Sequence, residues 1–434
     1  MTQSYVARAL RFAVVLLVAA IATSFCGGAT SSVVRAREKV FVLGFDGLDP
    51  TLARKWMDEG KLPNLKQLAD EGAFRTLGST QPSESPTAWS SFATGVNPGR
   101  HNIYDFLVRD PQTYAPDFNM IRREPPEFLW GWIPTKKPKA ISTRGGTSFW
   151  VEAGRAGIKS SVITVPVTFP PEAIEHGEML AGLPAPDLRG TVGTFYVFAT
   201  DISRFEEGAT QFGGILTRLR FDNGTAQADL SGPPNPIVKR KLEELKKTPT
   251  SDANRTAIAK LETQQNLALP VTVRWQRDSG AAAIEIDGTT IQLKAGEWSN
   301  WVPLRFKLNL FVTVHGMIQF HLIRADGELR LYGSPINIDP RDPPIPISTP
   351  DRLAPDLVKQ LGLYRTLGWA ESADKPLNEG YLDEAQFLYD ANKAMDDREQ
   401  LIMKSLDRDE WDLFVAAIGI CSWRLLRRPI ACRT

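Results

Sequence analysis

The chain is 434 residues long and carries 51 basic and 50 acidic side chains, which gives a formal net charge of +1. This balance provides no long-range basic field that would attract nucleic acid or another acidic partner, so we expect no nucleic-acid partner. The length allows about two to three domains, and the composition is that of a soluble globular protein. The three cysteines, at positions 26, 421 and 432, are too few and too scattered for a disulfide framework or a thiolate metal site.

Residues 1–29 have the layout of an export signal, because two arginines precede an apolar run over residues 12–22 and small residues follow. The apolar run is too short for an ordinary membrane span. Cleavage after Ala22 and lipidation of Cys26 are two processing routes, although Phe25 fits a lipoprotein signal poorly. The third interpretation is an uncleaved segment that tethers the chain to the membrane. In each case we expect an exported protein, periplasmic or extracellular.

Residues 39–50 (KVFVLGFDGLDP) predict a strand that ends near Asp46. Continuous β-branched and aromatic character bounded by glycine is typical of a strand buried on both faces in a parallel sheet. Asp46 would then lie at the carboxyl end of the strand, where open α/β sheets build ligand sites. The alternative is that Asp46 only begins an Asp-Gly turn. A helix should follow, with Asp49 as its N-cap, Pro50 in its first position and Gly60 at its end.

A second helix is predicted over residues 64–71, with Gly72 ending it. Small apolar residues over 88–94 then indicate a helix that enters the core. Ser85 stands at the head of that helix, where backbone N–H groups and the positive end of the helix dipole can hold a phosphate. The alternative is that Ser85 is only an N-cap before Pro86 at the first helical position.

These motifs resemble the type I phosphodiesterase and nucleotide pyrophosphatase branch of the alkaline phosphatase superfamily. The resemblance rests on the Asp-Gly pair that begins at Asp46 and on the later run over residues 85–101 (SPTAWSSFATGVNPGRH). It covers most of residues 38–195 and resumes near 380–420. Further segments that carry it are residues 146–150, 157–171 and 183–191.

The resemblance implies that Asp46 binds one of two zinc ions and that Ser85, which also touches metal, is the nucleophile. Thr87 is the runner-up nucleophile, although it is expected to lie one helical residue too deep. A divalent metal lowers the pKa of a bound oxygen by several units, and two ions clamp both oxygens of an in-line displacement at phosphorus. The implied substrate is a phosphate mono- or diester, hydrolysed through a phosphoseryl intermediate. Asp46 and Ser85 must then lie within about 8 Å of each other.

Two further features bear on the resemblance, one on the sulfatase branch and one on nucleotide specificity. Sulfatases need Cys/Ser-x-Pro-x-Arg around the nucleophile, and this pattern is absent here. Nucleotide pyrophosphatases carry an Asn after the His-x-Ile-x-Asp run, whereas Phe106 stands at that position. The departure at Phe106 weakens the expectation of nucleotide specificity, and we expect His101, within the run, to be structural rather than a ligand.

Residues 191–340 have the periodicity of an antiparallel β-rich module, interrupted by helices predicted over residues 237–247 and 252–267. Val271, Val273 and Trp275 alternate with polar residues. Asp-Gly pairs that begin at positions 287 and 326 indicate hairpins. This insertion either shapes a substrate cleft or lies apart from the site. His315 and His321 lie on adjacent β segments, and we expect them on the sheet surface without a metal.

The chain then returns to the core with a long amphipathic helix from about Asp383 and a buried strand over residues 411–418. The predicted fold class is α/β, with a doubly wound, mostly parallel sheet of the alkaline phosphatase-like core, an inserted β-rich module, and a core that is incomplete at the C-terminus. The expected parts are an export signal (1–29), the first part of the core (38–190), the insertion (191–340), the return to the core (341–420) and an aberrant tail (421–434).

The resemblance implies more zinc ligands after the last strand: an Asp-x-x-x-His pair, an Asp-His pair and one further His. Residues 421–434 contain four arginines and none of these ligands. A frameshift in the gene is one hypothesis, and a natural short variant is the alternative. We therefore expect the two zinc ions not to be fully bound and the chain to be inactive as it stands. The alternative function is a non-catalytic exported relic or binding protein of the same fold.

Overall fold

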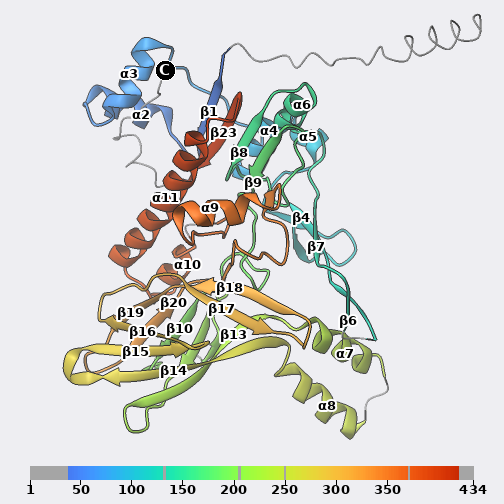
Figure 1. Ribbon diagram of the computed structural model, residues 1–434, viewed down its shortest axis with the longest axis vertical. Helices are drawn as coiled ribbons and strands as arrows, with labels where there is room; N and C mark the ends of the chain where they lie inside the picture. The colour runs from blue at the N-terminus through green and yellow to red at the C-terminus, as the bar shows by residue number, and fades with distance from the viewer. Residues whose placement is uncertain (1–37, 131–132, 204–206, 249–250, 370–371, 420–434) are drawn as a thin grey trace, which may run out of the picture.

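The computed structural model describes residues 38–130, 133–203, 207–248, 251–369 and 372–419 (Figure 1). The predicted export signal (1–29) and the tail (421–434) lie outside these residues. A mixed sheet occupies one end of the molecule and antiparallel sheets occupy the other, with the long helix α11 (Glu384–Asp407) reaching from one to the other (Figure 1). None of the helices in the described ranges combines the length and the apolar character that a bilayer crossing requires.

The central sheet joins segments that are far apart in the sequence. Its strand order is β1-β23-β8-β9-β22; the first four strands are parallel, and β22 is antiparallel to β9. The two core strands predicted at the start and near the end of the chain are therefore present and are direct neighbours. The bounds are β1 (Val40–Phe45), β23 (Leu413–Ile418), β8 (Ser160–Ile163), β9 (Gly177–Leu180) and β22 (Ser348–Thr349).

The first strand is less buried than predicted, although both of its faces pack against buried clusters, with Phe41, Leu43 and Phe45 on one face and Val42 on the other. Within the described part of the chain β1 is an edge strand, so one of its sides has no neighbouring strand. Val40 is 52% exposed, and the following residues of β1 are half-buried, whereas every residue of β23 is buried. An apolar run reports the preference of a segment for burial, but the number of neighbouring strands depends on distant parts of the chain.

The helices of the first part follow the sequence signals closely. The Asp49 carboxylate accepts a hydrogen bond from the Leu52 N–H at 2.8 Å, so Asp49 is the predicted N-cap of α2, and Gly60 has a φ of 70° just beyond the helix. Gly72 ends the next helix as predicted. The bounds are α2 (Pro50–Asp58), α3 (Pro63–Glu71), α4 (Ser85–Thr94), α5 (Pro98–His101) and α6 (Phe149–Arg155).

Three small antiparallel pairs between α5 and α6 were not predicted from the sequence. They are β2-β3, β4-β7 and β5-β6, and most of their residues are exposed or half-buried. Short exposed strands carry little of the alternation of apolar and polar residues that marks a half-buried strand. Their bounds are β2 (Leu107–Arg109), β3 (Pro116–Phe118), β4 (Ile121–Glu124), β5 (Glu127–Leu129), β6 (Ile133–Lys136) and β7 (Lys139–Ser142).

The predicted β-rich module is present as three sheets with the orders β11-β12-β10-β20-β19, β13-β14-β15-β16 and β17-β18-β21. All of its pairings are antiparallel except β10 with β12. The bounds are β10 (Tyr196–Ala199), β11 (Gly208–Ala209), β12 (Ile215–Arg218), β13 (Thr225–Pro234), β14 (Asn266–Gln276), β15 (Ala281–Ile286), β16 (Thr289–Lys294), β17 (Val302–Lys307), β18 (Thr313–Ile318), β19 (Phe320–Arg324), β20 (Arg330–Gly333) and β21 (Asn337–Ile338), with a 3-10 turn at Arg277–Ser279.

The hairpin predicted at Asp287 is confirmed, because Asp287 and Gly288 have φ values of 46° and 78° and connect β15 to β16. The predicted end of the second helix of the module is wrong. That helix ends at Glu262, and β14 begins at Asn266. The remaining helices are α7 (Pro236–Lys246), α8 (Asp252–Glu262), α9 (Leu353–Leu361) and α10 (Asp374–Asn378).

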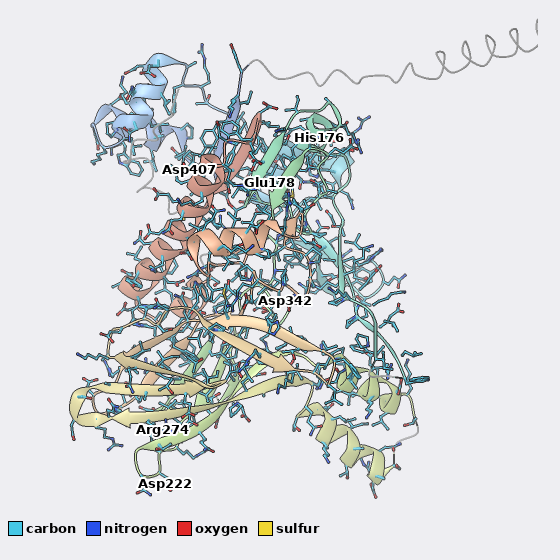
Figure 2. The ribbon with its side chains drawn as sticks, viewed as in Figure 1. His176, Glu178, Asp222, Arg274, Asp342 and Asp407 are labelled. Atoms are coloured by element: carbon cyan, nitrogen blue, oxygen red, sulfur yellow. The ribbon has the colours of Figure 1, made fainter. Side chains whose placement is uncertain are left out.

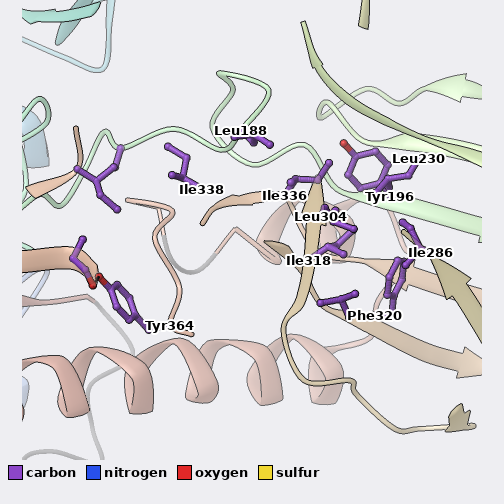
Figure 3. Close-up of a cluster of buried hydrophobic side chains, with 14 of the residues drawn as sticks. Leu188, Tyr196, Leu230, Ile286, Leu304, Ile318, Phe320, Ile336, Ile338 and Tyr364 are labelled. Carbon is purple, nitrogen blue, oxygen red and sulfur yellow. Dashed lines mark hydrogen bonds between the residues drawn. The ribbon is translucent and has the colours of Figure 1, made fainter. Parts of the chain in front are cut away.

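A continuous buried core holds the β-rich module together. Figure 3 shows side chains of Tyr196, Ile286, Leu304 and Phe320 gathered from different sheets of the module, with Tyr364 beside the long helix. The charged residues at the end of β14 and in the turn before β13 lie at the far end of the molecule from Glu178 of the central sheet, as the labels Arg274 and Asp222 show in Figure 2. The module therefore contacts the rest of the molecule mainly at its near end.

The expectation that His321 lies on the sheet surface is wrong. Its side chain is buried, with a relative exposure of 2%, and its ring stacks on Trp298 with centroids 4.4 Å apart. Burial lowers the pKa of His321. His315 is partly exposed, and its Nδ1 lies 2.7 Å from an Asp342 carboxylate oxygen. Phe320, His321 and Leu322 are all buried, so β19 is covered on both faces, which the sequence spacing alone did not reveal.

Candidate active site

The carboxyl ends of the parallel strands β1, β23, β8 and β9 meet at one edge of the central sheet, and a pocket of about 420 Å³ opens there. Its size is within the range of about 300–1,000 Å³ that is usual for small-molecule sites. Its walls come from the residues that follow these strands and from three helices. The lining residues are Asp46, Ser85, Phe106, Thr164, Pro166, Leu183, Gly368, Trp369, Asp374, Phe387, Arg398, Ala417, Ile418 and Gly419.

Asp46 lies at the predicted position, directly after β1 at the carboxyl edge of the sheet. Its backbone N–H donates to the Ile418 carbonyl at 3.1 Å, which extends the pairing of β1 with β23 by one residue. The side chain is half-buried and reaches the pocket. The strand pairing thus holds the backbone of Asp46 in place while its carboxylate faces the ligand space.

Ser85 contacts Asp46 across 39 positions of sequence. The Ser85 Oγ donates to the Asp46 carboxylate, with distances of 3.0 Å to Oδ1 and 3.2 Å to Oδ2. The proximity expected from the sequence, within about 8 Å, is therefore met with a direct hydrogen bond. Their roles as nucleophile and metal ligand stay predictions, since geometry alone assigns neither.

Close packing between β1 and α4 brings the two residues together. Gly44 faces the ring of Trp89 on α4, and a Cβ atom at Gly44 would lie 2.3 Å from that ring. Only glycine lets the ring lie so close to the strand. The ring in turn packs edge-on against Phe92 at 5.5 Å, which limits its freedom to move aside.

The first turn of α4 differs slightly from the sequence interpretation. Glu84 is the N-cap, and Ser85 is the first helical residue rather than the cap itself. Assignments of helix ends commonly differ by one residue, and Ser85 still stands where the helix N-terminus opens. Pro86 has no N–H, so the first turn offers the N–H groups of Ser85 and Thr87. The positive end of the helix dipole is therefore directed at the Ser85 side of the pocket.

Thr87, the runner-up nucleophile, is placed differently from Ser85. It is completely buried, and it is not among the residues that line the pocket. None of the described residues offers a hydrogen bond to its hydroxyl. Of the two hydroxyl groups, the structure brings only Ser85 to the pocket.

His101 has the surroundings of a structural residue. It is fully buried, its Nδ1 accepts from the Ile103 N–H at 3.1 Å, and its Nε2 lies 2.9 Å from the Ser91 Oγ. Burial lowers the pKa of His101, and the positive charge of Arg144 lowers it further. Both ring nitrogens are engaged in hydrogen bonds, and His101 does not line the pocket.

A strained residue forms part of the pocket wall. Thr164, just after β8, has a φ of 53°, which is unusual for a β-branched residue. Its hydroxyl donates to the Ala417 carbonyl at 3.2 Å, so β8 and β23 are tied together at the pocket. Strained backbone of this kind is concentrated at functional sites, which agrees with the position of the pocket.

Sequence reasoning missed three residues of this pocket: Arg398, Asp374 and Trp369. Phe106, which the sequence analysis singled out, lies in the pocket wall with its ring centroid 5.4 Å from that of Trp369. A signal for Arg398 was present, because it falls on the helical stripe that also contains Ala391, Ala394, Leu401 and Ile402. An arginine on a mostly apolar stripe is a signal that sequence reasoning can use, although the same face of α11 also buries Ser405. Asp374 and Trp369 lie next to loops and have no comparable periodic signal.

The described residues do not complete the metal site that the resemblance implies. Asp46 and Ser85 supply two ligand side chains, whereas a zinc site commonly uses about four ligands. Across the described ranges there is no group of three or more His, Cys, Asp or Glu side chains placed to hold one metal ion. The donor set in this part of the chain therefore does not fit a two-ion centre.

Comparison with protein families gives one match. Residues 40–231 match the model of the family described as Type I phosphodiesterase / nucleotide pyrophosphatase. The matched segment includes β1, Asp46 and Ser85. No curated protein and no solved structure matches the chain. The mixed α/β architecture is compatible with an alkaline phosphatase-like fold.

Proposed function

Residues 40–231 belong to the type I phosphodiesterase / nucleotide pyrophosphatase family of the alkaline phosphatase superfamily, and on this basis we propose that the protein hydrolyses phosphate mono- or diesters with Ser85 as the nucleophile. The family match supports phosphodiesterase or pyrophosphatase activity. The observation that carries the proposal for this chain is the hydrogen bond from Ser85 to Asp46 in a pocket at the carboxyl edge of the sheet. We also propose that the core has an alkaline phosphatase-like fold and that the protein is exported from the cytoplasm.

In the proposed step, the Ser85 Oγ attacks phosphorus in line with the leaving oxygen. A new Ser–O–P bond forms, the bond from phosphorus to the leaving group breaks, and the hydroxyl proton passes to the Asp46 carboxylate that already accepts it at 3.0 Å. The leaving oxygen departs with the electron pair of the broken bond and takes up the proton from Asp46. Water then attacks the phosphoseryl group, its hydroxyl joins phosphorus, its proton restores the Ser85 hydroxyl, and phosphate or a phosphate monoester is released. A carboxylate is a weak base for an alcohol, so the proton transfer must accompany the attack rather than precede it.

The surroundings of Ser85 favour an anionic reacting group. The N–H groups of the first turn of α4 and the helix dipole stabilise negative charge at this point. The family resemblance favours zinc, and Asp46 with Ser85 is the part of this chain that would contribute to holding it. The incomplete donor set is the reason why the proposed step uses only protein groups and water.

Release of p-nitrophenol from bis(p-nitrophenyl) phosphate and from p-nitrophenyl phosphate by the full chain tests the proposal, with and without added zinc. Ser85→Ala should abolish release, while Ser83→Ala, an exposed neighbour outside the pocket, should leave it unchanged. Mass spectrometry after rapid quenching should find phosphate on the peptide that contains Ser85.

Two outcomes count against a hydrolase. The first is a rate in the full chain, with added zinc, that does not exceed the rate in buffer. The second is a Ser85→Ala variant as active as the parent chain. Metal content after purification is a further measurement: about two zinc ions per chain would support a two-ion enzyme, and fewer than one would favour the non-catalytic relic.

A further inference from the structure

Arg398 is the cationic side chain among the described residues that line the pocket of Ser85 and Asp46. It belongs to α11 and lies on a stripe of that helix whose buried side chains are mostly apolar. Its aliphatic stem can pack along this stripe while the guanidinium group reaches the pocket. The position therefore brings a permanent positive charge to the site of the proposed reaction.

Among the described residues, no carboxylate lies within ion-pair distance of the Arg398 guanidinium. The guanidinium donates to the Gly368 carbonyl at 2.9 Å. Arg365, another arginine in contact with α11, shows the contrast, because it forms a bidentate pair with Asp390 at 2.7 and 3.1 Å. A guanidinium has five N–H donors, so Arg398 retains donors for an acceptor in the pocket.

The Gly368 carbonyl is a rigid anchor for this group. The Gly368 N–H donates to the Ala185 carbonyl at 2.8 Å, and a Cβ atom at Gly368 would lie 2.7 Å from the Ala185 nitrogen. The segment that carries the carbonyl is thus pressed against the chain that follows β9. A donor anchored in this way loses little further freedom when it binds a ligand.

The other charged groups of the pocket make a cation necessary for an anionic ligand. Asp46 and Asp374 contribute carboxylates to the lining, and a phosphoryl group would meet their repulsion. An arginine offers two parallel N–H groups that match the spacing of phosphate oxygens. A lysine would offer only a point charge.

We propose that Arg398 binds the phosphoryl oxygens of the substrate and holds the phosphorus opposite Ser85. This inference rests on the proposed function and names the residue that would fix the anion. It is a binding role: Arg398 takes no proton and forms no covalent bond in the step. The Gly368 contact sets the position of the guanidinium, and the phosphoryl group takes the remaining donors.

Isothermal titration of inorganic phosphate into the full chain tests the binding directly and does not depend on turnover. Arg398→Met keeps the apolar stem and removes the charge, and Arg398→Gln is a second neutral variant. Each should weaken phosphate binding about 10- to 100-fold, the range expected for a lost charge-assisted hydrogen bond. Arg398→Lys should recover part of the affinity. Lys404→Gln removes a positive charge from an exposed position on the same helix and should leave binding unchanged.

The KM for a phosphodiester substrate is a second measurement, and it would not change if Arg398 had only a structural role. Loss of phosphoryl binding should raise the KM for bis(p-nitrophenyl) phosphate in Arg398→Met while the thermal melt stays cooperative, and Arg398→Lys should lower the KM again. The inference would be overturned if a neutral variant that melts cooperatively bound phosphate as tightly as the parent chain does. The hydrolase proposal would still stand in that case. Absence of phosphate binding by the parent chain would overturn both.

Discussion

Gly44 is the position at which the packing of the site can be tested most directly. Replacement by alanine adds one carbon that would lie 2.3 Å from the Trp89 ring, whereas ordinary contacts begin at 3.4 Å. The ring and strand must therefore separate by about 1.1 Å. If α4 moves away as a body, the 3.0 Å contact between Ser85 and Asp46 lengthens beyond hydrogen-bonding distance.

The expected cost is that of overpacking, about 1–3 kcal/mol in the free energy of unfolding. The substitution should otherwise stabilise a strand slightly, since glycine within a strand costs roughly 0.5–1 kcal/mol relative to alanine. Urea unfolding measures the stability, and hydrolysis of bis(p-nitrophenyl) phosphate measures the effect on the site. We expect both quantities to fall in Gly44→Ala.

Gly78→Ala is the matched control, because a Cβ atom at Gly78 would meet no atom within 4 Å. A second test combines Gly44→Ala with Trp89→Leu, which removes the ring that the new methyl group meets. The double variant should be less affected than the sum of the two single variants. Unchanged stability and an unchanged rate in Gly44→Ala would refute the argument that this glycine sets the distance between Asp46 and Ser85.

Three further predictions follow from buried groups. Asp390→Ala should lower the free energy of unfolding by about 3–5 kcal/mol, because it leaves Arg365 charged and buried. Asp356→Ala, at an exposed ion pair, should cost much less, and denaturant unfolding of both variants checks this. Burial lowers the pKa of His321, so the folded chain binds fewer protons there than the unfolded chain. The free energy of unfolding should therefore fall as the pH drops below the unfolded pKa of about 6.5. His321→Phe should flatten this pH dependence, whereas His176→Asn, at an exposed site, should not. Asp46→Asn should lower the rate of hydrolysis at least as much as it lowers the affinity for the substrate, since it removes the proton acceptor of Ser85. An unchanged rate would eliminate Asp46 from the mechanism.

Local signals gave the most reliable sequence predictions. Asp49 with Pro50 predicted the start of α2, and the Asp287-Gly288 pair predicted a hairpin, because a cap or a two-residue turn is determined by the residues that form it. Asp46 and Ser85 also came together as expected, since a strand end and a helix beginning are both natural places for a ligand site in an α/β sheet.

Features that depend on the rest of the fold were predicted less well. The apolar run of β1 did not reveal that β1 is an edge strand, because its second neighbour could not be inferred from its own residues. His321 was assigned to the surface, although β19 is covered on both faces and buries Phe320, His321 and Leu322 alike. Arg398 lies more than 300 positions after Ser85, and only the docking of α11 against the sheet brings the two into one pocket.

The length of α11 gives the molecule a mechanical property. Near its first turns, Phe387 packs against the buried cluster of the β-rich module and Tyr389 stacks on Trp298, while Phe387 and Arg398 also form part of the pocket wall. The helix α11 therefore contacts the β-rich module near its first turns and the strands β23 and β8 of the central sheet elsewhere along its length. A movement of the β-rich module would therefore displace Phe387 and Arg398 in the pocket wall. Changes distant from Ser85 can in this way alter the affinity of the pocket for a ligand without contacting the ligand.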